Sequence, residues 1–158
     1  MNRFVALSAA IAVGGAGMAA SAQTIDPYYE CAYTFVDLGS PADVPANLGG
    51  LVFLDGEPDV LLIGGSANGA AGALYAVPVE RDPDGHIAGF AGPGVWYADA
   101  PDIDGGLCYG PEGVLFFSRY SQNHVGQIKP GSDGSDRDTD LTALGFSSSV
   151  GAFMFVPP

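Results

Sequence analysis

Short apolar runs separated by turn residues make up most of the chain after its first two dozen residues. Leu51–Leu54 is apolar throughout, and Asp55–Asp59 turns the chain into a second apolar run, Val60–Ile63. Continuous apolar runs of this length, bounded by Gly, Pro and Asp, are typical of strands buried on both faces. No segment of this part carries an apolar stripe with the 3.6-residue period of a helix. The pattern therefore predicts an all-β fold.

The same pattern continues through the rest of the chain. Ala73–Val79 contains Pro78, which cannot donate to a neighbouring strand and therefore favours an edge or outer position. Asp82–Gly85 is a strong turn signal after this strand. Further strands are expected at Phe35–Leu38, His86–Phe90, Trp96–Tyr97, Leu107–Tyr109, Val114–Tyr120 and Val125–Lys129, with another around Leu141–Leu144.

One unit occurs three times: a short polar strand, a turn-rich link, and small residues that open an apolar strand. Its copies are Thr34–Leu54, Val95–Gly110 and Thr139–Val156. The anchor glycines that open the apolar strands, Gly50, Gly106 and Gly151, lie 56 and 45 residues apart. Periods of this size are typical of arrays and propellers, in which each unit buries a face against its neighbour.

The first residues carry the pattern of a cleaved signal peptide. Met1–Arg3 is basic, Phe4–Ala20 is apolar and uncharged, and Ala20–Ala22 fits the small-residue rule for cleavage. A membrane anchor is the alternative, but the apolar run is short and is followed by no stop-transfer charges. We therefore expect residues 1–22 to be removed and the protein, starting at Gln23, to be periplasmic, secreted or held at the cell surface without a stable membrane anchor.

The chain is strongly acidic. It has 18 Asp and Glu residues against 5 Lys and Arg, a formal net charge of −13. Such a surface repels the phosphates of nucleic acids and anionic lipid head groups, so we expect neither as a partner. Solubility outside the cytoplasm explains the charge more simply than a specific cationic partner does.

The segment GGLCYGPEGVLFFSRYSQNHVGQI, residues 105–128, resembles a blade of the NHL or SMP-30/gluconolactonase type of β-propeller. It has a Gly-Leu inner strand, a Pro-x-Gly turn, an apolar second strand and an Asn-containing turn. The larger pattern over residues 33–156 resembles exported bacterial proteins that often end in a PEP-CTERM sorting signal. This chain has the pattern without the sorting tail.

The resemblance implies antiparallel, four-stranded blades within one domain, residues 23–158. Two blade-like units would span about 34–98 and 99–144, and residues 147–158 would begin a third. Because propellers usually close with four or more blades, the sequence predicts an incomplete propeller. The last apolar strand, Gly151–Val156, would leave an open edge, so we expect self-association or pairing with further blades there.

The loops that enter the innermost strands are the candidate binding site. These loops are Asp43–Asn47, Asp99–Asp104 and Ser147–Ser149. Asp99, Asp102 and Asp104 place three carboxylates close together, and hard oxygen ligands suit Ca²⁺. In SMP-30-like propellers a metal is held at the axis by acidic and amide residues from such loops, and the resemblance implies Asn47 and Asp104 for that role. The alternative is an acidic turn in an acidic protein.

Other polar residues are less specific. His86 and His124 lie in or beside turns without a companion at the spacing of metal ligands, so we predict surface or turn roles for both. A second acidic group does not have the glycine and glutamate that an EF-hand requires, and we interpret it as a solvated hairpin or an adventitious calcium contact. Its members are Asp133, Asp136, Asp138 and Asp140.

Two cysteines, Cys31 and Cys108, leave two interpretations open. Export would place them where disulfides persist, and a bridge closing so long a loop would stabilise the fold by about 4 kcal/mol in the chain-entropy model. Cys108 also lies in an apolar strand, where a free cysteine serves as a small core residue.

No catalytic set is organised in the sequence. There is no G-x-S-x-G nucleophile elbow and no phosphate-binding loop. We therefore predict a non-catalytic exported structural or interaction module that needs no cofactor. The alternative is a calcium-dependent, lactonase- or esterase-like propeller fragment, which the resemblance and the aspartates of the candidate loops suggest.

Overall fold

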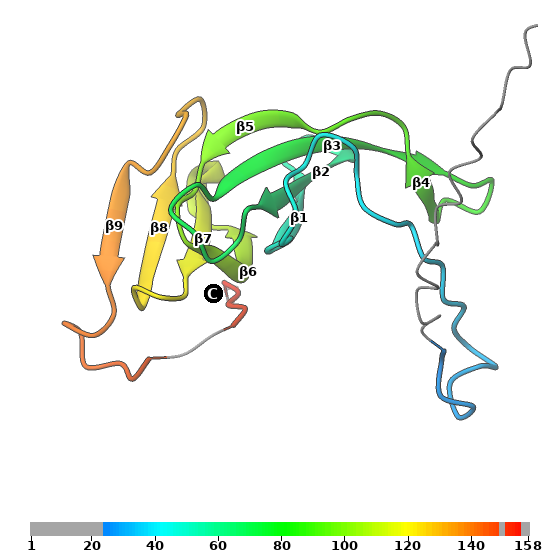
Figure 1. The fold of residues 1–158 in the computed structure, drawn as a ribbon, viewed down its shortest axis with the longest axis horizontal. Coiled ribbons are helices and arrows are strands. Elements are labelled where there is room, and N and C mark those ends of the chain that lie inside the picture. Colours follow the sequence, from blue (N-terminus) through cyan, green and yellow to red (C-terminus); the bar gives the residue numbers. More distant parts are fainter. Residues whose placement is uncertain (1–23, 149–150, 156–158) are drawn as a thin grey trace, which may run out of the picture. The chain divides into compact units, whose positions relative to one another are not determined.

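The computed structural model describes residues 24–148 and 151–155, so the signal peptide predicted for residues 1–22 lies outside the described residues. The chain divides into two compact units, Met1–Val36 and Asp37–Pro158. The described residues of the second unit form two antiparallel sheets and no α-helix (Figure 1). The predicted all-β class is therefore confirmed. No helix among the described residues is long and apolar enough to cross a membrane.

The described part of the first unit is a short run of turns. The Tyr29 carbonyl accepts backbone hydrogen bonds of 3.0 Å from both Ala32 and Tyr33. The Tyr29 ring packs edge-on against the rings of Tyr28 and Tyr33. The strand predicted at Phe35–Leu38 is wrong, because these residues form no regular structure and pair with no strand of the described chain; Phe35, Val36 and Asp37 are exposed.

The first sheet has the order β1-β2-β3, and both β4 and β5 pair with the remaining edge of β3. Its strands are β1 (Leu51–Leu54), β2 (Glu57–Gly65), β3 (Ala73–Arg81), β4 (Ile87–Phe90) and β5 (Val95–Asp99). Because β4 and β5 follow β3 in succession, they act together as one interrupted fourth strand. The predicted antiparallel sheet of about four strands is therefore confirmed.

Pro78 explains the interruption. It lies within β3, which has neighbours on both sides, so the edge position predicted for it is wrong. Its carbonyl accepts a 2.9 Å hydrogen bond from Ala91, in the segment between β4 and β5. In an antiparallel ladder the donor and acceptor of one residue face the same neighbour. The missing donor of Pro78 therefore faces the place where the ladder is broken.

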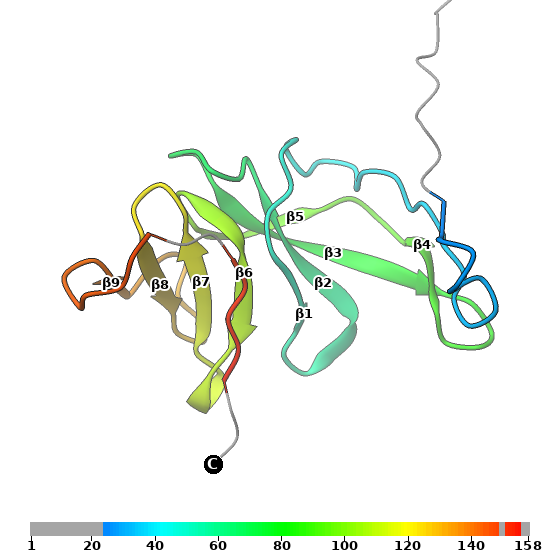
Figure 2. The same ribbon diagram turned by 90° about the horizontal axis from the view of Figure 1, so that it is seen from below.

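The second sheet is a simple meander with the order β6-β7-β8-β9 (Figures 1 and 2). Its elements are β6 (Ile103–Tyr109), the 3-10 turn η1 (Pro111–Gly113), β7 (Leu115–Arg119), β8 (His124–Ile128) and β9 (Arg137–Asp140). The strand predicted around Leu141–Leu144 is wrong. Those residues form a turn, because the Asp140 carboxylate accepts hydrogen bonds from the backbone of Thr142 and Ala143 and bends the chain.

The main core lies between the two sheets. The first sheet contributes Leu62 and Leu74, and the second contributes Ile103, Phe117 and Ile128, all fully or almost fully buried. A second cluster lies on the other face of the first sheet. Its buried members are Leu61, Ile63, Val77 and Val79. β2 and β3 supply residues to both clusters, so both faces of these strands are buried, as their continuous apolar runs predicted.

The anchor glycines mark where successive inner segments touch. A Cβ atom on Gly50 would lie 2.8 Å from the carbonyl oxygen of Gly105, and one on Gly106 would lie 2.8 Å from that of Gly151. Figure 2 shows β1 beside β6, and the red segment 151–155 beside β6 in turn. The strand predicted at Gly151–Val156 is not formed in its described part, residues 151–155, which makes no ladder. This segment lies against β6, where the rings of Phe153 and Phe155 approach Gly106 and Gly110.

Candidate functional site

The residues predicted as calcium ligands lie in the loop before β1 (Asn47), in the turn before β6 (Asp102) and in β6 itself (Asp104). The Gly50 nitrogen donates to the Asp104 carbonyl oxygen, which joins the end of the Asn47 loop to the start of β6. Asn47 is exposed, with left-handed backbone (φ 63°). Asp102, in contrast, directs its carboxylate to Arg119, with 3.2 Å between Oδ2 and Nη2. A guanidinium therefore already balances the charge of Asp102, and calcium at these residues stays a prediction.

Asp102 belongs to a network of charged side chains on one face of the second sheet. Arg119 Nη1 lies 2.7 Å from Asp138 Oδ2, and His124 Nδ1 lies 2.8 Å from the same oxygen. His124 Nε2 lies 3.8 Å from Asp140. The side chains of Arg119 and Asp102 are only 16% and 13% exposed, so this pair is largely shielded from solvent. Such pairing satisfies charges that would be costly to bury alone.

Strand register places these side chains together. Arg119 pairs with His124 across β7 and β8, and His124 pairs with Asp140 across β8 and β9. Directly opposed residues of an antiparallel sheet lie on the same face. The sequence predicts a surface or turn role for His124, and a solvated hairpin or an adventitious calcium contact for Asp138 and Asp140. In the structure these three side chains instead lie together in the charged network. The signal for β9 in the sequence was the placement of Asp138 and Asp140 at alternate positions, because alternate residues of a strand lie on one face.

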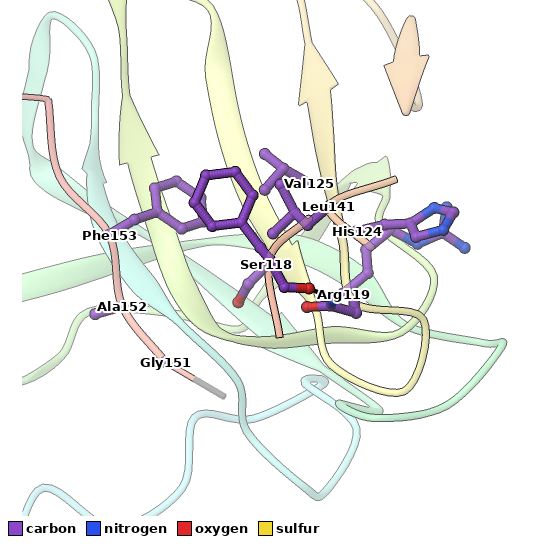
Figure 3. A pocket seen from close by; sticks show the side chains of 10 residues that line it. Ser118, Arg119, His124, Val125, Leu141, Gly151, Ala152 and Phe153 are labelled. Atoms are coloured by element: carbon purple, nitrogen blue, oxygen red, sulfur yellow. Dashed lines mark hydrogen bonds between the residues drawn. The ribbon is translucent and has the colours of Figure 1, made fainter. Parts of the chain in front are cut away.

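A pocket of about 280 Å³ lies on the other face of this sheet, where residues 151–153 run beside it. Ser118 and Val125 face it, because each is the neighbour in sequence of a residue whose side chain enters the charged network. Figure 3 shows the Phe153 ring turned toward Val125 and Leu141, with the His124 ring pointing away from them. The apolar wall of the pocket consists of Val125, Leu141, Phe146, Ala152 and Phe153.

Asn123 closes one side of the pocket and holds the turn behind it. Its Nδ2 group donates to Thr142 Oγ1 (2.9 Å) and to the Phe146 carbonyl (3.2 Å). Its backbone carbonyl accepts a hydrogen bond from Leu141, and its left-handed backbone (φ 53°) suits asparagine. The residue is only 6% exposed, yet its Oδ1 atom has no partner among the described residues. An unpaired buried acceptor is costly and therefore calls for an explanation.

A separate group of potential metal ligands lies in the hairpin between β3 and β4. One ligand atom each from Asp82, Asp84 and His86 lies within 4.8 Å of the others. The Asp82 carboxylate accepts backbone hydrogen bonds from Asp84 and His86, and the bond from His86 is the main reason that the pKa of Asp82 is lowered. These bonds form the turn that the sequence predicts at Asp82–Gly85, and they account for the proximity of the three side chains.

The two cysteines are both free thiols in this structure. Cys31 is exposed, and Cys108 is half-buried in β6. Burial raises the pKa of the Cys108 thiol. The interpretation of Cys108 as a small apolar residue of a strand agrees with this placement, and the bridge between Cys31 and Cys108 stays a prediction.

Comparison with known proteins does not identify a relative. No protein-family model, curated protein or solved structure matches this chain. The resemblances to NHL and SMP-30-like blades and to PEP-CTERM proteins therefore stay predictions.

Proposed function

We propose that this protein is a non-catalytic, exported interaction module with β-propeller architecture, in which two copies associate head to tail. In this proposal the two antiparallel sheets, β1–β5 and β6–β9, act as two blades, and the segment 151–155 begins a third. Two copies would supply four blades, which is the smallest usual number for a closed propeller. Each sheet buries one face in the main core that the two sheets share, and this packing supports the architecture.

The repeated glycine contact carries the proposal. Gly50 meets Gly105 at the first junction, and Gly106 meets Gly151 at the second, in the same manner. At the first junction the second sheet then covers the first with Phe117 and Ile128. At the second junction the described residues over the sheet are the segment 151–155 with Leu141 and Phe146, and Met154 is 80% exposed. An exposed apolar segment at this position suits pairing with another chain.

A second copy offers a matching surface. Leu51 and Phe53 are exposed apolar residues of β1, and they lie on the face of the first sheet that is turned away from the second sheet. Contact between this face of one copy and residues 151–155 of the other would repeat the packing direction of the two sheets within the chain. Such head-to-tail contacts generate closed rings when the rotation permits. The high negative charge of the chain opposes association of two copies. Salt screens this repulsion, so the association should strengthen as the salt concentration rises.

Size-exclusion chromatography with light scattering tests the association. We expect a dimer at about 100 µM, well above the micromolar Kd of a modest interface. Met154→Asp should give a monomer, because it places a charge in the contact, while Val95→Asp, at an exposed position of β5, should leave the dimer intact. A monomeric wild-type protein at this concentration, in high as well as low salt, would refute the proposal.

A mixing experiment tests the head-to-tail arrangement. Phe53→Asp should also abolish the dimer, because it changes the opposite contact surface. A two-fold ring has two equivalent junctions, so a mixture of Met154→Asp and Phe53→Asp chains retains one unmodified junction. We expect the mixture to dimerise more than either variant alone. Equal behaviour of the mixture and the single variants would exclude this arrangement.

A further inference from the structure

The pocket beside Asn123 does not include Met154, and it borders the charged network, because Arg119 and His124 are among its lining residues. Its apolar wall lies on the face of the second sheet that carries Ser118 and Val125. Arg119 is paired with Asp102 and Asp138 through its Nη atoms, and His124 is paired with Asp138. The charges nearest the pocket are thus already balanced within the protein. A ligand that enters this pocket gains most when it is neutral, because an ion would lose its hydration without a free counter-charge.

Three polar groups of the residues that line the pocket have unused hydrogen-bonding capacity, and one of them is the buried Nε donor of Arg119. Asn123 Oδ1 is a buried acceptor without a described partner, and the two bonds made by Nδ2 establish which end of the amide it is. The Ser118 hydroxyl oxygen accepts a 2.9 Å hydrogen bond from Gly106, which leaves its proton free to be donated. The lining residues therefore offer one acceptor, Asn123 Oδ1, and two donors, the Ser118 hydroxyl and Arg119 Nε. A hydroxyl group can pair with an acceptor and with a donor, since it donates one hydrogen bond and accepts others.

We propose that the pocket binds a small neutral alcohol whose hydroxyl group reaches Asn123 and Ser118 and whose apolar ring lies against Phe146 and Phe153. A volume of about 280 Å³ accommodates a single ring with a short substituent. The apolar wall excludes water from the ring, and the buried acceptor selects against a hydrocarbon of the same shape. This binding activity goes beyond the association of two copies and does not require it.

Benzyl alcohol and toluene are suitable probes, because they have the same ring and differ in the hydroxyl group. Titration followed by amide chemical shifts should show saturable binding of benzyl alcohol with a Kd on the order of 1 mM, as its size suggests. The largest shifts should fall on Ser118, Asn123 and Val125. Toluene should bind about tenfold more weakly, because it leaves the Asn123 acceptor unsatisfied.

Two substitutions in β8 locate the site. Val125→Phe fills the pocket and should weaken benzyl alcohol binding at least about tenfold. Gln127→Phe is the matched control: it places the same ring on the same face of the same strand, but Gln127 does not line the pocket, and binding should be unchanged. Equal loss in both variants, or binding unaffected by Val125→Phe, would overturn the assignment.

A third substitution tests the role of the hydroxyl group. Ser118→Ala should reduce the preference for benzyl alcohol over toluene while toluene binding persists, which also shows that the variant is folded. An unchanged preference would overturn the proposed orientation. Absence of saturable binding in the wild-type protein would overturn the proposal as a whole. Water would then be the only partner for Asn123 Oδ1. Met154→Asp should bind benzyl alcohol as the wild type does, which separates this proposal from that of dimerisation.

Discussion

The backbone nitrogen of Gly50 donates a hydrogen bond of 2.6 Å to the carbonyl oxygen of Asp104. This bond joins the start of β1 to the start of β6, so one edge strand of each sheet begins beside the other. It requires close backbone approach, since a Cβ atom on Gly50 would also lie 2.9 Å from Cβ of Leu107. The spacing of anchor glycines in the sequence is therefore a spacing of close contacts between successive inner strands.

The contact between Gly106 and Gly151 predicts that alanine destabilises the protein at Gly106 more than at the adjacent Gly105. A Cβ atom on Gly106 would lie 2.7 Å from Ser118 Oγ and 2.8 Å from the Gly151 carbonyl oxygen, whereas one on Gly105 would meet nothing within 4 Å. We expect Gly106→Ala to lower the free energy of unfolding by about 1–3 kcal/mol through overpacking. Gly105→Ala, the control, should change it by less than about 0.5 kcal/mol. Urea denaturation measures both, and equal effects would contradict the contact.

The charged network predicts unequal roles for two arginines. Arg119→Met leaves the largely buried Asp102 without its partner, and we expect a loss of about 3 kcal/mol in the free energy of unfolding. Arg81→Met removes a pair with Asp59, whose side chain is well exposed, together with hydrogen bonds to the Pro58 and Gly85 carbonyl oxygens, but it leaves no buried charge unpaired and should cost less than Arg119→Met.

Adding Asp102→Asn to the Arg119→Met variant provides the decisive control. The second substitution removes the charge that the first leaves unpaired, so the double variant should lose less stability than the sum of the two single changes. Strict additivity in urea denaturation would show that Asp102 and Arg119 do not interact.

The hydrogen bond that the Asp136 carboxylate accepts predicts that the stability of the protein depends on pH. A 2.8 Å hydrogen bond from the backbone of Lys129 is the main cause of the lowered pKa of Asp136. Its pKa is thus below the unfolded value of about 3.9, so the stabilisation is present above that pH and disappears as the pH falls through the folded pKa. The difference in Tm between the wild type and Asp136→Asn should be largest near neutral pH and should vanish in acid.

Asp133→Asn is the control for this measurement. Asp133 lies on the same connection between β8 and β9, and its carboxylate accepts no hydrogen bond recorded among the described residues. Its substitution should leave the pH dependence of Tm close to that of the wild type. A pH profile that changes as much for Asp133→Asn as for Asp136→Asn would refute a specific role for the Lys129 contact.

The two thiols should differ in reactivity. The thiolate is the reactive form, and burial raises the pKa of Cys108, whereas Cys31 is exposed. We expect iodoacetamide to modify Cys31 at least about tenfold faster than Cys108 in the folded protein, with mass spectrometry as the readout. If neither thiol reacts before a reductant is added, the disulfide that the sequence allows would be the correct interpretation.

Much of the strand pattern could be predicted because apolar runs and turn residues are local signals. Leu51–Leu54 has the predicted bounds, and β2 and β3 extend the predicted runs by a few polar residues. The error at Leu141–Leu144 has a definite cause. Its leucines suggested a strand, but the Asp140 carboxylate binds the following backbone nitrogens and produces a turn, so that the polar residues Arg137–Asp140 complete the sheet.

The candidate pocket could not be predicted in the same way. Its lining comes from β7, β8, the turn after β9 and residues 151–153, which are not neighbours in the sequence. Asn123 was visible as a turn residue, but its buried and unpaired Oδ1 depends on the turn that its Nδ2 group holds. The charged network likewise depends on the register between Arg119 and His124.

The sequence by itself determined the all-β class, the strands with apolar runs, and the three glycines at which inner segments meet. These properties follow from local alternation of apolar and turn residues and from the absence of a side chain on glycine. Only the tertiary structure decided that Arg119 and His124 share one face with Asp138, and that Asn123 and Ser118 line a pocket on the other. Those relationships depend on strand register, because a shift of one residue would exchange the two faces.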